Sequence, residues 1–150
     1  ALDPDVDEAR VIEQLEDRRF SGRGLGALLL DQGFVSGLGN YLRSEILWWA
    51  GLHPSWRPRD LDDEDRADLA RWILDVTRQS YRTGGITDCL VRVAEAKAAG
   101  VPRRLHRHAA VARAGRPCPE CGRAIDKIEV GSRRLYLCVR GQPAPARAGR

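Results

Sequence analysis

Apolar residues recur at helical spacing twice near the N-terminus and predict two helices. The first covers about residues 5–18, with Asp3 or Asp5 near its start as a capping group. Its apolar side is formed by Ala9, Ile12 and Leu15. The second covers residues 24–33. The buried stripe of this second helix is formed by Leu25, Leu28 and Leu29.

A third helix is predicted to begin at Asn40, whose short polar side chain favours a capping position. Its packing residues are Tyr41, Ile46, Leu47 and Trp48. Gly51, followed by His53-Pro54, supplies the stop signal because glycine tolerates a left-handed conformation and proline cannot continue a helix.

The longest predicted helix begins near Asp62, whose carboxylate can accept hydrogen bonds from the first-turn amides. Glu64 and Asp65 complement the positive end of the helix. Its apolar positions recur at i, i+3, i+4 and i+7 and are Leu69, Trp72, Ile73 and Val76. Thr83-Gly84-Gly85 is predicted to end it.

The chain after this helix has weaker patterns. Residues 85–116 are interpreted as linker and loop, although VRVAEAKAAG could form a short helix. Two β-prone runs flank Gly131-Ser132 and predict a hairpin; their apolar residues are Ile125, Ile128, Val130, Leu135 and Leu137. The tail PAPARAGR is predicted to be disordered. The whole pattern favours a mainly α fold with one small hairpin.

Composition narrows the class of protein. A chain of 150 residues with 43% hydrophobic content suits one domain of ordinary size or two small ones. It contains no run of eighteen apolar residues, and ALDPDVDEAR has neither the basic start nor the apolar middle of a signal peptide. We therefore expect a cytoplasmic protein with no membrane partner. Four cysteines, two of them in Cys118-Pro-Glu-Cys121, favour metal binding over a disulfide scaffold.

Charge is distributed unevenly along the chain. Residues 1–75 carry nine basic and sixteen acidic side chains, whereas residues 76–150 carry sixteen basic and five acidic ones. All but Lys97 and Lys127 of the basic residues are arginines, whose forked guanidinium suits phosphate. The second half is therefore a candidate surface for a polyanion. A preference for arginine codons would explain the excess of arginine equally well, but it does not explain the asymmetry.

The segment LLLDQGFVSGLGNYLRSEILWWAGLHP, residues 28–54, places glycines between two apolar helical stretches. Gly37 and Gly39 allow a ligand to approach the backbone closely, and the helix that begins at Asn40 presents free N–H groups and a positive dipole end. These features are typical of a phosphate site. A tight helix–helix corner without a ligand explains the same residues equally well.

The same segment closely resembles the helix-two-turns-helix of the formamidopyrimidine-DNA glycosylase and endonuclease VIII family, and GNYLRSEILW is more similar to the endonuclease VIII branch. The resemblance runs from Leu2-Asp3-Pro4 to Gln142 and weakens between residues 85 and 110. It implies that Asn40 and neighbouring backbone amides hold DNA phosphate next to a lesion. Gly37 and Gly39 fit the close approach of that phosphate.

The cysteines extend the resemblance, because family members end in a zinc finger of the form C-x2-C-x16-C-x2-C on a β-hairpin. Cys118, Cys121 and Cys138 occupy the first three ligand positions, but the fourth position is Gly141. Structural zinc prefers four ligands, so this departure leaves the binding of zinc open. Substitute ligands considered from the sequence are His53, His106, His108, Cys89, Asp126 and water.

The resemblance also implies a role for the hairpin tip. In the family, an arginine at the position of Arg133 contacts the lesion phosphate, and in the endonuclease VIII branch this arginine takes part in δ-elimination. The resemblance therefore makes Arg133 a candidate catalytic and DNA-binding residue, with Arg134 as the alternative. The family's N-terminal proline nucleophile, its adjacent glutamate and its hairpin lysine have no counterpart in this chain, which begins Ala1-Leu2-Asp3. We therefore expect the chain alone to be inactive.

These observations predict a helix-two-turns-helix domain over residues 1–100, a linker and zinc-finger-like β-hairpin over residues 101–142, and a tail over residues 143–150. The predicted function is the damaged-DNA-binding part of a base-excision-repair glycosylase with AP lyase activity. Its partner would be duplex DNA with damaged bases or abasic sites, bound by a monomer. A stand-alone nucleic-acid-binding module is the alternative, and a zinc-hairpin interaction domain without nucleic acid is a third possibility.

Overall fold

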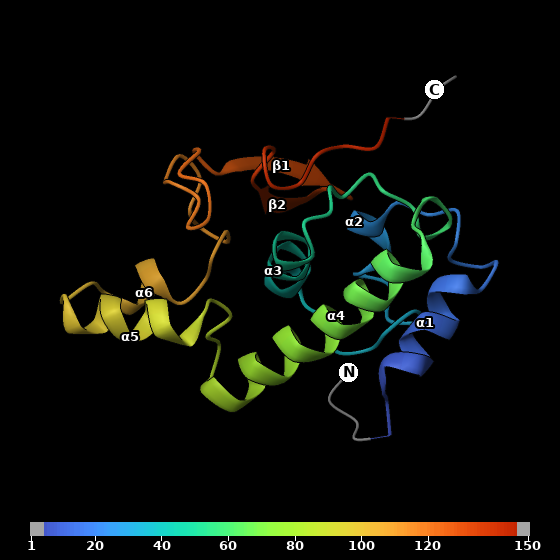
Figure 1. The fold of residues 1–150 in the computed structure, drawn as a ribbon, viewed down its shortest axis with the longest axis horizontal. Coiled ribbons are helices and arrows are strands. Elements are labelled where there is room, and N and C mark those ends of the chain that lie inside the picture. The colour runs from blue at the N-terminus through green and yellow to red at the C-terminus, as the bar shows by residue number, and fades with distance from the viewer. Residues whose placement is uncertain (1–4, 147–150) are drawn as a thin grey trace.

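Helices dominate the computed structural model, which describes residues 5–146 (Figure 1). The helices are α1 (Glu8–Glu16), α2 (Leu25–Leu28), α3 (Asn40–Ala50), the 3-10 turn η1 (Pro58–Asp60), α4 (Asp63–Thr83), α5 (Leu90–Ala98) and α6 (Arg103–His106). The strands β1 (Asp126–Val130) and β2 (Arg133–Leu137) pair antiparallel. The described residues therefore confirm a mainly α fold with one hairpin.

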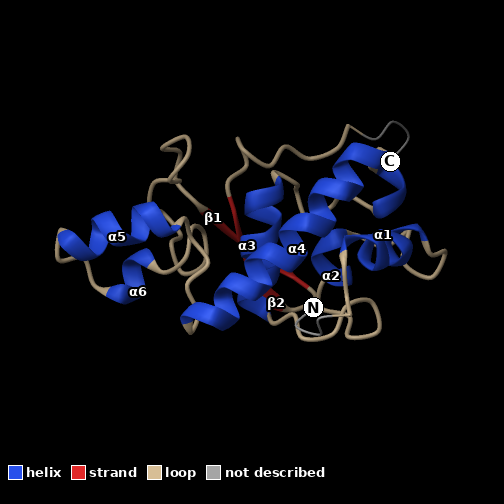
Figure 2. Ribbon diagram, turned by 60° about the horizontal axis from the view of Figure 1, so that its bottom comes forward, coloured by secondary structure: helices blue, strands red, loops and turns tan. Residues whose placement is uncertain are grey.

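The helices α1, α3 and α4 enclose the main core. The helix α4 packs against both α1 and α3, and α3 also packs against β2. Leu135 and Leu137 of β2 belong to this same core, so the hairpin packs directly on the helices. Both views place α5 and α6 at one end of the molecule and α1 at the other (Figures 1 and 2). The domain boundaries at residues 100 and 142 stay a prediction.

Asp7 caps the first helix. Its carboxylate accepts from the backbone N–H of Arg10 at 3.0 Å, so the prediction of Asp3 or Asp5 as the cap was wrong for Asp5, and Asp3 lies outside the described residues. The buried side consists of Val11 and Leu15. The predicted apolar side was only partly correct, since Leu15 is buried and Ala9 is exposed.

The second helix is much shorter than the predicted residues 24–33. Leu25, Leu28 and Leu29 are fully buried as predicted, but regular helix ends at Leu28. The Asp31 carboxylate accepts from the N–H of Gly33 at 2.7 Å and pairs with Arg23. Such local side-chain bonds to the backbone compete with helix, and here they stabilise a turn.

The longest helix has the predicted ends. The Asp62 carboxylate accepts from the N–H of Asp65 at 2.8 Å, and Gly84 closes the helix with a φ of 69°. Left-handed backbone of this kind favours glycine. Gly51 ends α3 in the same way, with a φ of 69°.

The interpretation of residues 85–116 as linker and loop was wrong, because α5 and α6 lie within it. Val93 is the only buried residue of α5, so this segment lacks the buried apolar stripe that would predict a helix. Its alanines, Glu95 and Lys97 are strong helix formers, and Arg92 pairs with Asp88 one turn earlier. Local propensity, rather than periodicity, therefore accounts for α5.

The beginning of the C-terminal tail is held to the fold. The carbonyl of Pro143 accepts from the indole N–H of Trp56 at 3.0 Å, so disorder does not extend over the whole of residues 143–150 as predicted. Residues 147–150 of that tail, and Leu2-Asp3-Pro4 at the other end, lie outside the described residues.

Candidate nucleic-acid interface and cysteine cluster

The glycine turn before α3 faces open space. Gly37 has a φ of 89°, which requires glycine, whereas Gly39 has an ordinary φ of −92°. A Cβ atom built on either residue would meet no protein atom within 4 Å. No acidic side chain lies in the first turn of α3 to neutralise its positive end. The N–H of Gly37 donates to the side chain of Gln32 at 3.0 Å, so the amides open to a phosphate belong to the first turn of α3.

Gly39, and not Asn40, is the N-cap of α3, so the prediction that Asn40 caps this helix was wrong. Asn40 is the first residue of the helix, and its side chain serves a long-range contact instead. Its Nδ2 donates to the carbonyl of Arg134 at 2.9 Å. The oxygen of the same amide is buried and has no hydrogen-bond partner among the described residues.

The hairpin tip lies beside the start of α3 through this contact. Gly131 and Ser132 both have a φ of 63°, as a two-residue hairpin turn with left-handed central residues requires. Arg133 opens β2 directly after the turn, and its side chain and that of Arg134 are exposed. The fold therefore brings Asn40 and the arginine-bearing hairpin together, although 94 residues separate Asn40 from Arg134.

A buried arginine that the sequence analysis did not select connects α3 to the hairpin. Arg43 is fully buried, and its guanidinium donates to the carbonyls of Gly26 at 2.6 Å, Val130 at 3.1 Å and Arg133 at 3.2 Å. Burial lowers the pKa of Arg43, and the positive charge of Arg133 lowers it further. Arg43 therefore anchors both ends of the hairpin turn, Val130 and Arg133, to α3.

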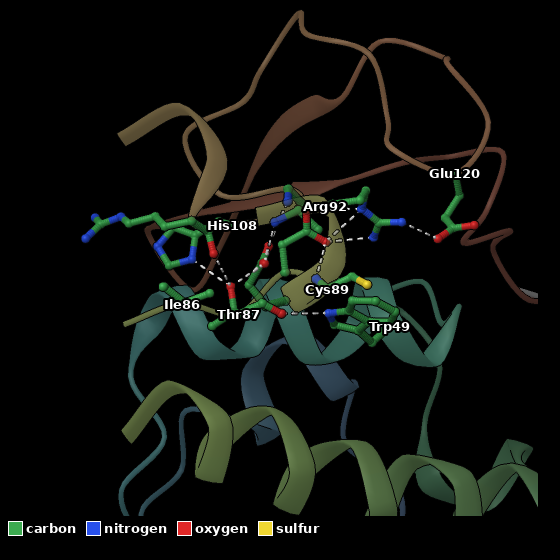
Figure 3. A network of polar contacts seen from close by, with 12 residues as sticks. Trp49, Ile86, Thr87, Cys89, Arg92, His108 and Glu120 are labelled. Carbon is green, nitrogen blue, oxygen red and sulfur yellow. Dashed lines mark hydrogen bonds and ion pairs between the residues drawn. The ribbon is translucent and has the colours of Figure 1, made fainter. Parts of the chain in front are cut away.

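Glu45 organises a second buried network, which Figure 3 shows from close by. Its carboxylate accepts from the backbone N–H groups of Ala109 at 2.6 Å, Ala110 at 2.8 Å and Val111 at 3.1 Å. The hydroxyl of Thr87 donates to the same carboxylate at 2.5 Å. Burial raises the pKa of Glu45, while these four donated hydrogen bonds lower it. One carboxylate thereby ties three distant segments together.

His108 completes this network. Its Nδ1 lies 2.7 Å from the Thr87 hydroxyl, which already donates to Glu45, so the histidine is the donor in this pair (Figure 3). A neutral imidazole with its proton on Nδ1 can make this bond. Burial, followed by the charges of Arg107 and Arg103, lowers the pKa of His108 to about 4, while Asp88 raises it.

We expect His108 to make the fold sensitive to acid. Its pKa is lower in the folded chain than the ordinary 6.5, so the unfolded chain binds the proton more tightly. Stability from this group is present above pH 6.5 and is lost as the pH falls toward 4, by about 3 kcal/mol in total. Urea unfolding of the native chain and of His108→Gln, measured from pH 7 to pH 4, tests this. The difference between the two profiles separates His108 from the carboxylates, and parallel profiles would contradict the assignment.

A cavity of about 450 Å³ adjoins the glycine turn. Its lining includes Gly37, Tyr41, Gly84, Arg107 and His108. The hydroxyl of Tyr41 is hydrogen-bonded to that of Ser80 at 2.7 Å. The Glu45 network therefore shapes the loop that faces the candidate phosphate site.

Three cysteine thiols converge beside the hairpin. The Sγ atoms of Cys118, Cys121 and Cys138 all lie within 4.8 Å of one another, and those of Cys121 and Cys138 are 3.4 Å apart. A backbone N–H bond from Arg123 lowers the pKa of Cys121, and burial raises that of Cys138. The residues fit three of the four ligands of a zinc finger.

None of the side chains proposed from the sequence as substitute ligands joins this cluster within the part of the chain that the structure describes. His108 binds Thr87, the ring of His53 is bonded to Ser55, and Cys89 lies outside the cluster.

Among the described residues, no helix has the length and apolar composition needed to span a membrane.

Comparison with known proteins shows that the chain is similar to a domain of DNA glycosylases and to Endonuclease 8 proteins. Residues 1–90 match the family described as Formamidopyrimidine-DNA glycosylase H2TH domain. Endonuclease 8 of Shigella sonnei (strain Ss046) is 42% identical over 137 residues, which are 91% of this chain and 49% of that protein. Endonuclease 8 of Escherichia coli O127:H6 (strain E2348/69 / EPEC) has the same identity and coverage. The chain therefore spans about half the length of the curated relatives it matches.

Solved structures show the same likeness. The Fpg of Lactococcus lactis in complex with abasic-site DNA matches with a TM-score of 0.71 and 26% identity, covering 91% of this chain and 47% of that chain. The MutM (Fpg) protein of Thermus thermophilus matches with a TM-score of 0.72 and 31% identity, covering 92% and 50%. On the match over residues 1–90, this chain belongs to the formamidopyrimidine-DNA glycosylase H2TH-domain family.

Proposed function

We propose that this chain is the damaged-DNA-binding part of a base-excision-repair DNA glycosylase with AP lyase activity, of the endonuclease VIII type. The observation that supports this most directly is the hydrogen bond from Asn40 to the Arg134 carbonyl. It joins the open start of α3 to the exposed arginine hairpin, which supports the proposal that the two form one phosphate-binding surface. The likeness to Endonuclease 8 and to Fpg bound to abasic-site DNA supports the same assignment.

In this proposal Asn40 and neighbouring backbone amides at the start of α3 hold one DNA phosphate, and Gly37 and Gly39 allow its close approach. Arg133 contacts the phosphate next to the lesion and assists δ-elimination. Its exposed guanidinium at the hairpin tip supports that role, because a forked donor can bind a phosphate in two places at once. Arg134 is the alternative, because its side chain is exposed as well.

The proposal includes zinc held by Cys118, Cys121 and Cys138, whose convergent thiols support it. Zinc would stabilise the loop that leads into the hairpin, since structural sites contribute folding free energy. We further propose that the protein acts as a monomer on chromosomal DNA, and therefore in the cytoplasm at the nucleoid.

We expect the 150-residue chain to bind duplex DNA with an abasic-site analogue more tightly than intact duplex. Arg133→Ala should weaken binding roughly tenfold and lower the magnitude of the log–log salt slope by about 0.9, since one phosphate contact is lost. Asn40→Ala should weaken binding without an equal change of slope, because the amide is uncharged. Fluorescence anisotropy at several salt concentrations measures both quantities.

Arg10→Ala is the matched control, because Arg10 is exposed and pairs with nearby Glu13. It should leave affinity within about twofold. Binding that does not distinguish abasic from intact duplex, together with an unchanged affinity of both Arg133→Ala and Asn40→Ala, would refute the proposed surface. Strand cleavage by the 150-residue chain alone would contradict the expectation that it binds without catalysis.

A further inference from the structure

The distances between the three cysteine sulfurs are close to those of a zinc site. Tetrahedral zinc with Zn–S bonds of about 2.3 Å places its sulfur ligands about 3.8 Å apart. The three Sγ atoms here lie within 4.8 Å of one another, and Cys121 and Cys138 are separated by 3.4 Å. Small rotations of the side chains would therefore bring all three thiolates into the first coordination shell.

Backbone hydrogen bonds hold the two cysteine turns in place. The N–H of Cys118 donates to the carbonyl of Arg123 at 2.7 Å, and the N–H of Gly122 donates to the carbonyl of Cys118 at 2.9 Å. On the second turn, Cys138 donates its N–H to the side chain of Gln142 at 2.8 Å and accepts from the backbone N–H of Gln142 at 2.8 Å. The ligand-bearing backbone is therefore ordered without a fourth protein ligand.

Gln142 connects the second turn to the helical body. Its side chain is fully buried, and its Nε2 donates to the carbonyl of Leu52 at 3.0 Å. The same amide accepts from Cys138 through its oxygen. Both ends of the amide are thereby used for structure, so Gln142 is not available as a metal ligand.

The fourth position is space that opens to solvent. Gly141 is exposed, and a Cβ atom built on it would lie 3.9 Å from the Sγ of Cys138, an ordinary contact, with no other protein atom within 4 Å. A cysteine would fit there, but glycine leaves the place beside the sulfur unfilled. No other histidine, cysteine or carboxylate among residues 5–146 places a ligand atom within the cluster.

We propose that Cys118, Cys121 and Cys138 form a three-sulfur zinc site whose fourth coordination position, at Gly141, takes an exogenous ligand, a small thiolate or water in its absence. Three protein ligands with one open position is the ligand count of zinc sites that exchange a bound molecule, whereas closed structural sites have four. A thiolate is the preferred occupant because it matches the softness of the three sulfurs already present. A small molecule from solvent can therefore reach this zinc ion, in contrast to the zinc ion of a finger with four protein ligands.

Cobalt(II) in place of zinc tests the proposal, because its visible and sulfur-to-metal absorption bands report the number and kind of ligands. The full 150-residue chain, loaded with cobalt in thiol-free buffer, should show a sulfur-to-metal band about three quarters as strong as that of Gly141→Cys, in proportion to the ligand count. Titration with 2-mercaptoethanol should raise the native band to the level of Gly141→Cys. The same titration should leave Gly141→Cys unchanged, because its fourth position is filled.

Cys89→Ser is the matched control, since Cys89 is a free cysteine outside the cluster, and it should respond to the thiol as the native chain does. Elemental analysis should give one zinc per native chain, and competition with a chelator should show roughly tenfold or tighter zinc binding by Gly141→Cys. The zinc stoichiometry and the thiol titration of the native chain stand even where Gly141→Cys does not fold.

Three results would overturn the proposal. A native chain that binds no cobalt or zinc lacks the site altogether. A native band that already equals that of Gly141→Cys in thiol-free buffer means that the chain itself supplies a fourth ligand. A native band that does not respond to the thiol means that the fourth position is closed. The inference rests on the zinc of the proposed function, and a chain that binds no metal would contradict both. DNA affinity is not a readout in any of these, so failure here and failure of the proposed DNA binding are distinguishable.

Discussion

Glu45→Ala is expected to lower the free energy of unfolding by about 3 kcal/mol or more. The carboxylate is fully buried and accepts from the N–H groups of Ala109, Ala110 and Val111 and from the Thr87 hydroxyl. Alanine would leave the buried N–H groups of Ala109 and Ala110 without this acceptor, whereas the Thr87 hydroxyl keeps the Arg107 carbonyl at 3.4 Å as another acceptor. Urea unfolding followed by tryptophan fluorescence measures the loss.

Two comparisons make this test specific. Glu45→Gln keeps the size of the side chain but places an NH₂ group opposite backbone N–H donors, so it should destabilise the fold nearly as much as alanine. Glu120→Ala is the control, because Glu120 is largely exposed and pairs with Arg92 at the surface, where such a pair contributes about 0.5 kcal/mol or less. A stable Glu45→Gln would show that the carboxylate is protonated and that its ionised form does not organise the loop.

The predicted elements that the structure confirms are those in which the hydrophobic pattern and the residues at the ends of the element predict the same boundaries. The helix from Asp63 to Thr83 combines an apolar stripe with a capping aspartate and a closing glycine, and the hairpin combines two β-prone runs with Gly131-Ser132. The elements that failed lack one of these signals. Residues 29–33 continue the helical pattern of α2, but the side chain of Asp31 bonds to the backbone and stabilises a turn instead.

The roles of the charged residues in α3 could not be predicted from hydrophobic periodicity. Seven consecutive residues of α3, 42–48, are buried, so no polar face exists to reveal which side meets solvent. Arg43 and Glu45 are two positions apart and point to different partners, one to the hairpin and the other to residues 109–111. A charged pair within an apolar helix was the available signal, and only the fold shows that the two residues serve separate long-range contacts.

The candidate site was predicted in its parts but not in its assembly. Asn40, Arg133 and the three cysteines were selected from the sequence, and the structure places Asn40 and the hairpin in contact. Spacing along the chain could not show that contact, because it depends on the docking of β2 against α3. The wrong assignment of Asn40 as the cap has the same origin, since its side chain bonds to the hairpin and leaves the cap position to Gly39.

Arg43→Lys is expected to weaken DNA binding about tenfold although it conserves the charge and lies wholly inside the protein. The Arg43 guanidinium reaches the carbonyls of Gly26, Val130 and Arg133 together, and a single ammonium group cannot bond to all of them in this geometry. The hairpin turn would then lose part of its anchorage, and placing Arg133 on a phosphate would cost additional conformational entropy. Anisotropy with abasic-site duplex measures the change, and circular dichroism checks that the variant is folded.

The double variant Arg43→Lys with Arg133→Ala separates this positioning role from general destabilisation. If Arg43 acts by placing Arg133, the lysine substitution should reduce affinity strongly in the native background and little once Arg133 is alanine, since the group it positions is gone. Arg66→Lys is a suitable control, because Arg66 also donates to backbone carbonyls, those of Pro58 and Leu61, but lies away from the hairpin. Additive losses from Arg43→Lys and Arg133→Ala, or an equal loss from Arg66→Lys, would show that Arg43 only stabilises the fold and does not position the hairpin for DNA.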